Sequence, residues 1–219
     1  MLHPVPGRIG SEGTRRAPTM SDLPPKRGGV ARDRARAFGS LTYRDPREVL
    51  VELRRVERLI PPGTDPKIRH LRTHDLRDVR ELRLASLFCY GWGQISVQPM
   101  LVAHAEAQDY DAVATWIDSD TANFAPIQLK EVVPTDLNPE ATVQAVIDDL
   151  TKYRDSRDLT VAVHLNQSAR FSPLALKIPK LDIASLWIFG SVTPDQSRWG
   201  VWGNFLETIQ YGEFAYPEG

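Results

Sequence analysis

The stretch that most restricts the fold is residues 109–133, which reads as two β-strands joined by a polar turn. Side chains of a strand alternate between its two faces. Ile127 and Leu129 therefore fall on one face of the second strand, and Gln128 and Lys130 fall on the other. The apolar face is typical of core, so the sequence predicts a half-buried hairpin with an amide and an ammonium group side by side.

Asp111 enters the first strand of this hairpin, seventeen residues before Gln128. We expect the turn SDTANFAP to bring the strands together, so that the carboxylate reaches the same polar face as Gln128 and Lys130. Polar groups at mid-strand cost stability unless they are paired, hydrated or bound to a metal. The plain alternative is a cross-strand ion pair between Asp111 and Lys130, which contributes about 0–1 kcal/mol when exposed.

Helical and strand patterns flank the hairpin on both sides, over about residues 75–168. A helix that carries Glu81 is expected from Asp75 until Gly91-Trp92-Gly93, followed by a strand over residues 95–104. Downstream, Asn138 is a plausible N-cap of a helix over residues 139–155, which leads into a strand over residues 159–165. The order is helix, three strands, helix and strand.

This combination of motif and element order resembles the PD-(D/E)xK nuclease superfamily, which has the restriction-endonuclease-like fold. The match consists of Asp111 and Gln128-Leu129-Lys130. Tyr110 stands where the motif has proline, and Gln128 replaces the commoner acid, as it does in some members of the family. The resemblance implies an α/β fold with a central mixed β-sheet flanked by helices.

The resemblance also implies a metal-dependent nuclease site. Its catalytic residues would be Lys130, Asp111 and Gln128, and Mg²⁺ or Mn²⁺ would bind Asp111, Gln128, the backbone carbonyl of Leu129 and Glu81. Lys130 would hold or polarise the attacking water. Since Gln128 removes one negative charge, we expect weaker metal binding unless Glu81 or a substrate phosphate supplies the missing oxygen. The expected partner is nucleic acid, with DNA favoured; endonuclease or exonuclease action and a homodimer stay open.

Two alternatives accompany this hypothesis. Glu81 could be an exposed side chain paired with Arg77, Arg80 or Arg83. The whole protein could be a catalytically inactive member of the fold that binds nucleic acid or another protein. Candidate side chains that converge beside an open basic cleft would favour the nuclease, whereas a sealed acidic pocket would favour the binding module.

Charge is unevenly distributed along the 219 residues. Residues 1–83 hold 19 Lys and Arg against 11 Asp and Glu, whereas residues 84–219 hold 8 against 17. The basic third could bind a phosphate backbone or pair with the acidic remainder. Residues 1–42 are rich in Pro, Gly, Arg and Ser, so we expect a disordered or loosely ordered basic tail before a single α/β domain over residues 43–219. With no long apolar run and no secretory signal, a cytoplasmic protein is expected.

Several further residues carry open alternatives. Gln144 and Tyr153 could face the site or be ordinary surface positions, and Asn166 could lie near the edge of the site. Trp187, Trp199 and Trp202 could stack on bases, although core packing is the favoured interpretation.

Overall fold

The computed structural model describes residues 30–219 except 70, 106, 108 and 168–171. Its helices are α1 (Val30–Gly39), α2 (Pro46–Leu59), α3 (Pro66–Arg69), α4 (Arg77–Ser96) and α5 (Val143–Asp149), with short 3₁₀ turns at His74–Leu76, Leu150–Lys152 and Pro173–Ala175. The strands are β1 (Leu101–His104), β2 (Ala112–Asp118), β3 (Thr121–Val132), β4 (Ser156–Leu165), β5 (Ile183–Ser191), β6 (Arg198–Gly203) and β7 (Gln210–Ala215).

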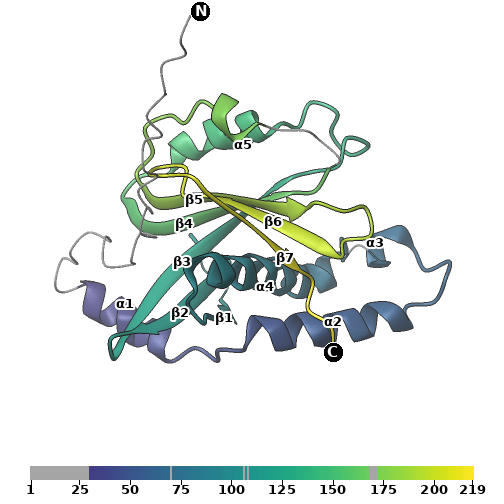
Figure 1. Ribbon diagram of the computed structural model, residues 1–219, viewed down its shortest axis with the longest axis horizontal. Helices are drawn as coiled ribbons and strands as arrows, with labels where there is room; N and C mark the ends of the chain where they lie inside the picture. The colour runs from purple at the N-terminus through teal and green to yellow at the C-terminus, as the bar shows by residue number, and fades with distance from the viewer. Residues whose placement is uncertain (1–29, 70, 106, 108, 168–171) are drawn as a thin grey trace, which may run out of the picture.

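The described strands form one seven-stranded mixed sheet in chain order, twisted from β1 to β7 (Figure 1). Neighbouring strands from β1 to β3 and from β5 to β7 are antiparallel, whereas β3, β4 and β5 are parallel. The predicted α/β class with a mixed sheet flanked by helices is confirmed. The expected order of helix, three strands, helix and strand is present as α4-β1-β2-β3-α5-β4, and β5 to β7 extend the sheet.

Two apolar clusters cover the two faces of the sheet. On one face, α4 packs against side chains such as Ile127 and Phe189, and α2 adds Leu50 to the same cluster. On the other face, α5 contributes Ile147 to a cluster with Val161 and other side chains of β4 and β5. The molecule therefore has helix layers on both faces of the sheet, with α2 packed against α4 (Figure 1).

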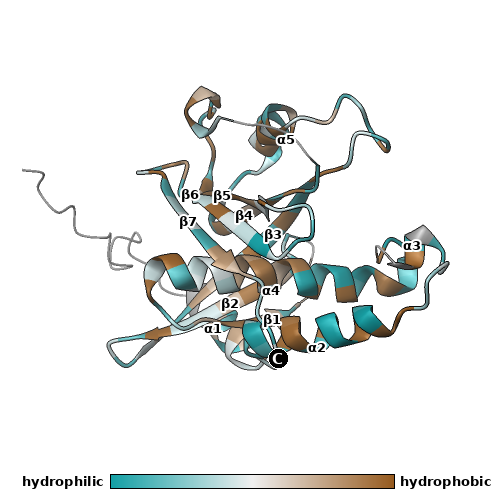
Figure 2. Cartoon of the chain, turned by 45° about the vertical axis from the view of Figure 1, so that its right-hand side comes forward, coloured by the Kyte–Doolittle hydropathy of each residue, from teal (hydrophilic) through white to brown (hydrophobic). Residues whose placement is uncertain are grey.

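The hydropathy of α4 changes along its length. Its first turns are hydrophilic, and its middle is hydrophobic (Figure 2). Buried residues run almost without interruption from Leu84 to Trp92, as expected for a helix covered on most sides. The hydrophilic turns lie at the end of the helix where the candidate site is found, so one helix provides both core and charged side chains.

The predicted end of α4 at Gly91-Trp92-Gly93 is wrong, because the helix continues to Ser96 and β1 starts only at Leu101. The glycines serve close packing instead. A Cβ on Gly91 would lie 2.6 Å from Val201 Cγ2 and would also meet the ring of Phe214. Absence of a side chain thus lets β6 and β7 approach the helix.

Two other predicted boundaries also differ. The hairpin turn is shorter than SDTANFAP, since Ser119 and Asp120 both have positive φ and form a tight two-residue connection. The helix expected from Pro139 begins at Val143. Asn138 accepts a hydrogen bond from the backbone of Glu140 within a turn, and the side chain of Thr142 caps the helix instead.

Within the expected basic tail, residues Val30–Gly39 form helix α1. Residues 1–29 of the expected tail lie outside the described residues. Helix α1 buries Phe38 against the rings of Tyr110 and Phe124, and Arg34 pairs with Asp158 at 2.5 Å. One aromatic anchor therefore attaches a segment whose composition alone favoured disorder. Helix α2 follows, with Asp45 as its N-cap.

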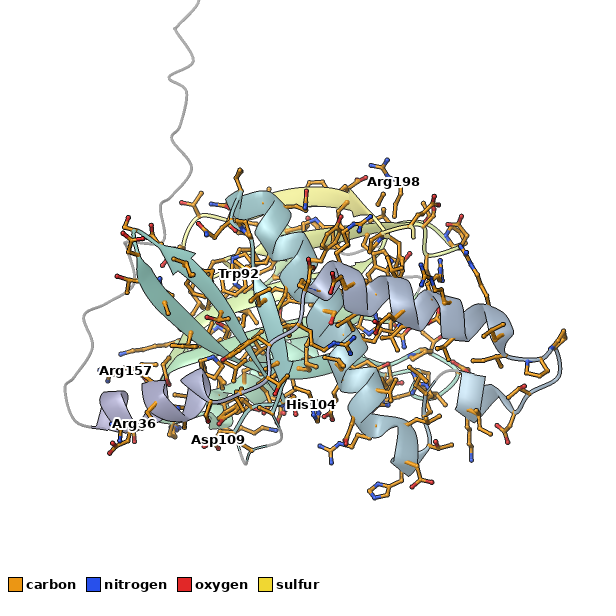
Figure 3. All side chains as sticks on the ribbon, turned by 90° about the horizontal axis from the view of Figure 1, so that it is seen from below. Arg36, Trp92, His104, Asp109, Arg157 and Arg198 are labelled. Carbon is orange, nitrogen blue, oxygen red and sulfur yellow. The ribbon has the colours of Figure 1, made fainter. Side chains whose placement is uncertain are left out.

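The core interpretation is confirmed for two tryptophans. Trp187 and Trp199 are buried, whereas Trp202 is half-buried and stacks on Tyr211. Trp92 of α4 also lies inside the molecule, while Arg157 and Arg198 point outward at its periphery (Figure 3). In the described part of the chain, no helix has both the length and the apolar character needed to cross a lipid bilayer.

Candidate functional site

The site lies where β3 extends beyond its partner β2. Pairing of the two strands ends at Ala112 and Ile127, and the backbone N–H of Asp111 donates to the Ile127 carbonyl at 2.9 Å. From residue 128 to 132, β3 continues as the parallel partner of β4. Its other edge is therefore free to present backbone N–H and C=O groups to the side chains of the site.

Asp111 is the centre of this arrangement. Its Oδ2 accepts a hydrogen bond from the Leu129 backbone N–H at 2.7 Å and a second one from Gln128 Nε2. Gln128 Nε2 also donates to the Leu129 carbonyl oxygen at 3.3 Å. One amide nitrogen thus bridges a carboxylate oxygen and a backbone oxygen, which are two of the atoms predicted to bind a metal.

The sequence-predicted residues share one cavity of about 280 Å³. Its lining residues are Arg77, Arg80, Glu81, Leu84, Asp111, Gln128, Leu129, Lys130 and Glu131. The Lys130 ammonium lies 5.5 Å from the centre of the Tyr153 ring, so Tyr153 does lie beside a site residue. Gln144 instead bonds Asp148 and the backbone of Lys177, away from the cavity lining.

Glu81 reaches the cavity from the first turns of α4. Only 8% of its surface is exposed, and its Oε1 accepts a hydrogen bond from Arg77 Nε at 2.7 Å. The sequence alternative of an ion pair with Arg77 is therefore found, but not on an exposed side chain. No role in the site was predicted for Arg77. Its position one helical turn before Glu81 is the sequence feature that could have indicated this contact.

The pKa of the Asp111 carboxyl reflects its burial and the charges around it. Burial raises the pKa of the Asp111 carboxyl above its ordinary value, while the hydrogen bond from Leu129 lowers it and the nearby Glu81 carboxylate raises it further. Lys130 and Arg77 oppose the increase to a smaller extent. Two half-buried or buried carboxylates close enough to repel each other are a setting that a bound cation stabilises.

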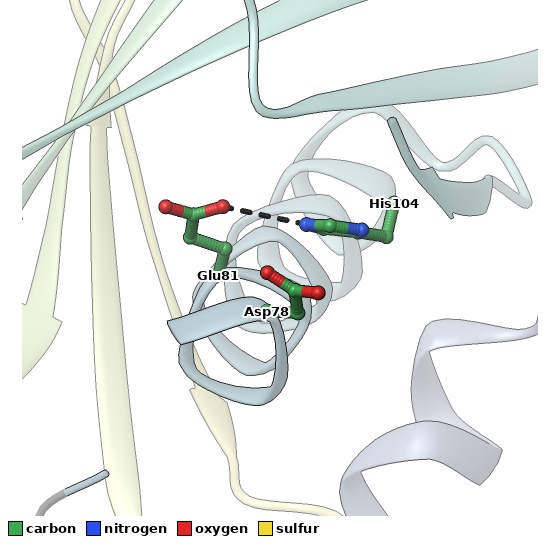
Figure 4. A group of neighbouring side chains, drawn as sticks. All are labelled: Asp78, Glu81 and His104. Carbon is green, nitrogen blue, oxygen red and sulfur yellow. Dashed lines mark hydrogen bonds and ion pairs between the residues drawn. The ribbon is translucent and has the colours of Figure 1, made fainter. Parts of the chain in front are cut away.

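A second group of metal-binding side chain types adjoins the first (Figure 4). Asp78, Glu81 and His104 each place a ligand atom within 4.8 Å of the others, and His104 Nε2 lies 3.3 Å from Glu81 Oε2. Asp78 and Glu81 are three residues apart on α4, which the sequence could have indicated. His104 could not be assigned in this way, because its position depends on β1 lying against α4.

The surroundings of the cavity are mixed rather than strongly basic. Three cationic and three acidic side chains line it. Among the described residues, no side chain that follows Glu131 in the sequence lines this cavity. The C-terminal segment packs elsewhere, since Tyr216 donates to the Leu50 carbonyl oxygen on α2. The cavity is thus not covered by the segment that would have sealed it.

Comparison of the chain with protein-family models, curated proteins and solved structures gave no match.

Proposed function

We propose that the protein is a metal-dependent nuclease of the PD-(D/E)xK type, which hydrolyses phosphodiester bonds in nucleic acid, with DNA as the favoured substrate. The observation that carries this proposal is the convergence of Glu81, Asp111, Gln128 and Lys130 in one cavity. They come from a helix, the start of one strand and the free edge of the next, in the order that the resemblance requires.

The side chains present fit a hard divalent cation such as Mg²⁺ or Mn²⁺. Asp111 and Leu129 already direct two oxygen atoms at a common neighbour, the amide nitrogen of Gln128. Turning this amide about its last torsion would direct Oε1 toward the same point and give an all-oxygen donor set. A cation held there would supply charge neutralisation at the phosphate and a more acidic bound water.

Side chains and backbone groups of the protein would position the water, the phosphate and the carboxylates. Lys130 carries a positive charge on the polar side of β3 and would orient the attacking water or stabilise charge on the phosphate. The Leu129 N–H fixes the Asp111 carboxylate by a 2.7 Å hydrogen bond, so that the carboxylate is held in position without a ligand. Arg77 would hold the Glu81 carboxylate in position through their 2.7 Å ion pair.

The alternative of an inactive binding module has one observation in its favour. Gln128 satisfies both Asp111 and Leu129 with its own amide, which makes the cluster self-sufficient in hydrogen bonds. In that case the three residues would hold the hairpin together, and added cations would change neither the stability of the protein nor its binding to nucleic acid.

A cleavage assay on a variant that lacks the Lys130 charge distinguishes the nuclease from the inactive binding module. We expect Lys130→Ala to abolish Mg²⁺-dependent cleavage of a mixture of plasmid, single-stranded DNA and RNA while its thermal unfolding matches the wild type. Lys180→Ala is the matched control, because Lys180 is exposed and does not line the cavity. Full cleavage by the Lys130 variant would rule out the assigned site.

A further inference from the structure

A larger cleft of about 940 Å³ adjoins the candidate site. It opens at the carboxyl ends of the parallel strands β3 and β4, marked by Glu131 and Asn166, which is where open α/β sheets commonly bind ligands. The cleft and the site cavity share Arg80, Leu84 and Glu131 in their linings. A ligand in the cleft would therefore be continuous with one in the site.

Cationic side chains in the cleft outnumber the acidic ones by five to four. Three arginines are engaged by acids: Arg54 and Arg83 each pair with Glu57, and Arg72 pairs with Glu131 at 2.9 Å. Arg80 differs from them. Within the described part of the chain it makes no ion pair or hydrogen bond, although its side chain is half-buried at the junction of the two cavities. A half-buried guanidinium with five donors and no acceptor is suited to a phosphate.

A buried histidine forms part of the wall of the cleft. His164 lines the cleft, and its Nδ1 is inaccessible to solvent and has no hydrogen-bond partner. The ring stacks between Phe189 and Trp199, at centroid distances of 5.2 and 5.8 Å. Buried polar atoms of folded proteins are almost always paired, so the unpaired Nδ1 is an exception in the wall of the cleft.

Part of the remaining wall is apolar. Ile60, Leu71 and Leu137 line the cleft, and Leu137 is 56% exposed at the loop that follows β3. The volume is at the upper end of the range for small-molecule sites, about 300–1,000 Å³. A space of this size, with an apolar part of its wall and an arginine free to bind a phosphate, suits unstacked nucleotides.

We propose that this cleft binds a single strand of nucleic acid next to the cleaved bond, with Arg80 on a backbone phosphate and the apolar wall against a base. This inference rests on the proposed nuclease function and assigns its substrate as single-stranded or frayed. In this assignment Arg80 is a substrate-binding residue. Its contact with the backbone phosphate does not require a metal ion in the candidate site.

Binding without turnover tests the cleft separately from catalysis. The full chain would be titrated into a fluorescein-labelled dT₆ oligonucleotide in EDTA, and anisotropy would be followed over a range of salt concentrations. We expect Arg80→Gln to weaken binding about tenfold and to reduce the slope of log K against log salt by about 0.7, the value for one phosphate contact on a single strand. Arg58→Gln, which removes the same charge from an exposed position outside the cleft, should bind as the wild type does.

The outcomes distinguish the two proposals. Equal binding by the Arg80 and Arg58 variants would overturn the cleft assignment, and so would tighter binding of a blunt duplex that loses the same factor in Arg80→Gln. Lys130→Ala should fail to cleave in Mg²⁺, whereas Arg80→Gln should lose binding in EDTA relative to Arg58→Gln. Retained cleavage by Lys130→Ala would refute the nuclease site without affecting the anisotropy result.

Discussion

Replacing the buried histidine of the cleft should remove a large part of the acid sensitivity of the protein. The pKa of His164 is lowered from 6.5 to about 4, chiefly by burial; the Glu131 carboxylate opposes this decrease, and the charges of three arginines add to it. The arginines are Arg72, Arg80 and Arg83. The folded protein therefore keeps the imidazole neutral over a pH range in which the unfolded chain protonates it.

The sign and size of the effect follow from this difference in pKa. Because the folded-state value is the lower one, the contribution to stability is complete above pH 6.5 and is lost as the pH falls toward 4. Between pH 7 and pH 5 the loss is about 2 kcal/mol. His164→Phe keeps a ring between Phe189 and Trp199 and also removes the unpaired Nδ1, so at pH 7 we expect it to be neutral or slightly stabilising.

Urea unfolding of the wild type and His164→Phe at pH 7 and pH 5 measures this effect. Carboxylates and other histidines titrate in both proteins, so their contributions cancel in the difference between the two stability changes. We expect the wild type to lose about 2 kcal/mol more than the variant. An identical loss in both proteins would show that His164 is protonated normally in the folded state, and would refute the placement of the ring in a buried cationic environment.

Two other substitutions test the site and the fold. Gln128→Glu adds a third carboxylate beside Asp111 and Glu81, so the protein without metal should lose about 1–3 kcal/mol of stability and bind Mn²⁺ about tenfold more tightly by calorimetry; unchanged affinity would exclude this position from the metal shell. Gly91→Ala forces a Cβ against Val201 and should cost about 1–3 kcal/mol in thermal unfolding, whereas Gly39→Ala, where a Cβ meets nothing within 4 Å, should not; equal melting temperatures would contradict the close packing of α4 on β6.

The hairpin was predictable because its information is local. Alternation along β3 placed Ile127 in the core and Gln128 on the opposite face, and the structure agrees. The spacing of Asp111 and Gln128 was also sufficient to predict their contact across the hairpin. What the sequence did not contain was the start of β2 only at Ala112, which leaves the Leu129 backbone N–H free to bond Asp111.

Features that depend on distant segments were missed or misplaced. Gly91 has the local character of a helix terminator, yet its meaning depends on strands more than 100 residues later in the chain. The cleft is likewise assembled from α2, α4, β4 and the turn before β6, so no local pattern could have indicated that Arg80 and His164 belong to one wall. The proximity of His104 to Glu81 also depends on distant segments, because it requires β1 to lie against α4.

The most direct test of the nuclease site is a calorimetric titration of Mg²⁺ and Mn²⁺ into the wild type and Asp111→Asn, with cleavage of plasmid, single-stranded DNA and RNA assayed on the same preparations. Asn keeps the size of the side chain and an acceptor for the Leu129 N–H, so the fold should be preserved. We expect the wild type to bind metal and cleave, and the variant to do neither. Equal metal binding by the two proteins, or cleavage that survives in Asp111→Asn, would contradict a catalytic centre at Asp111.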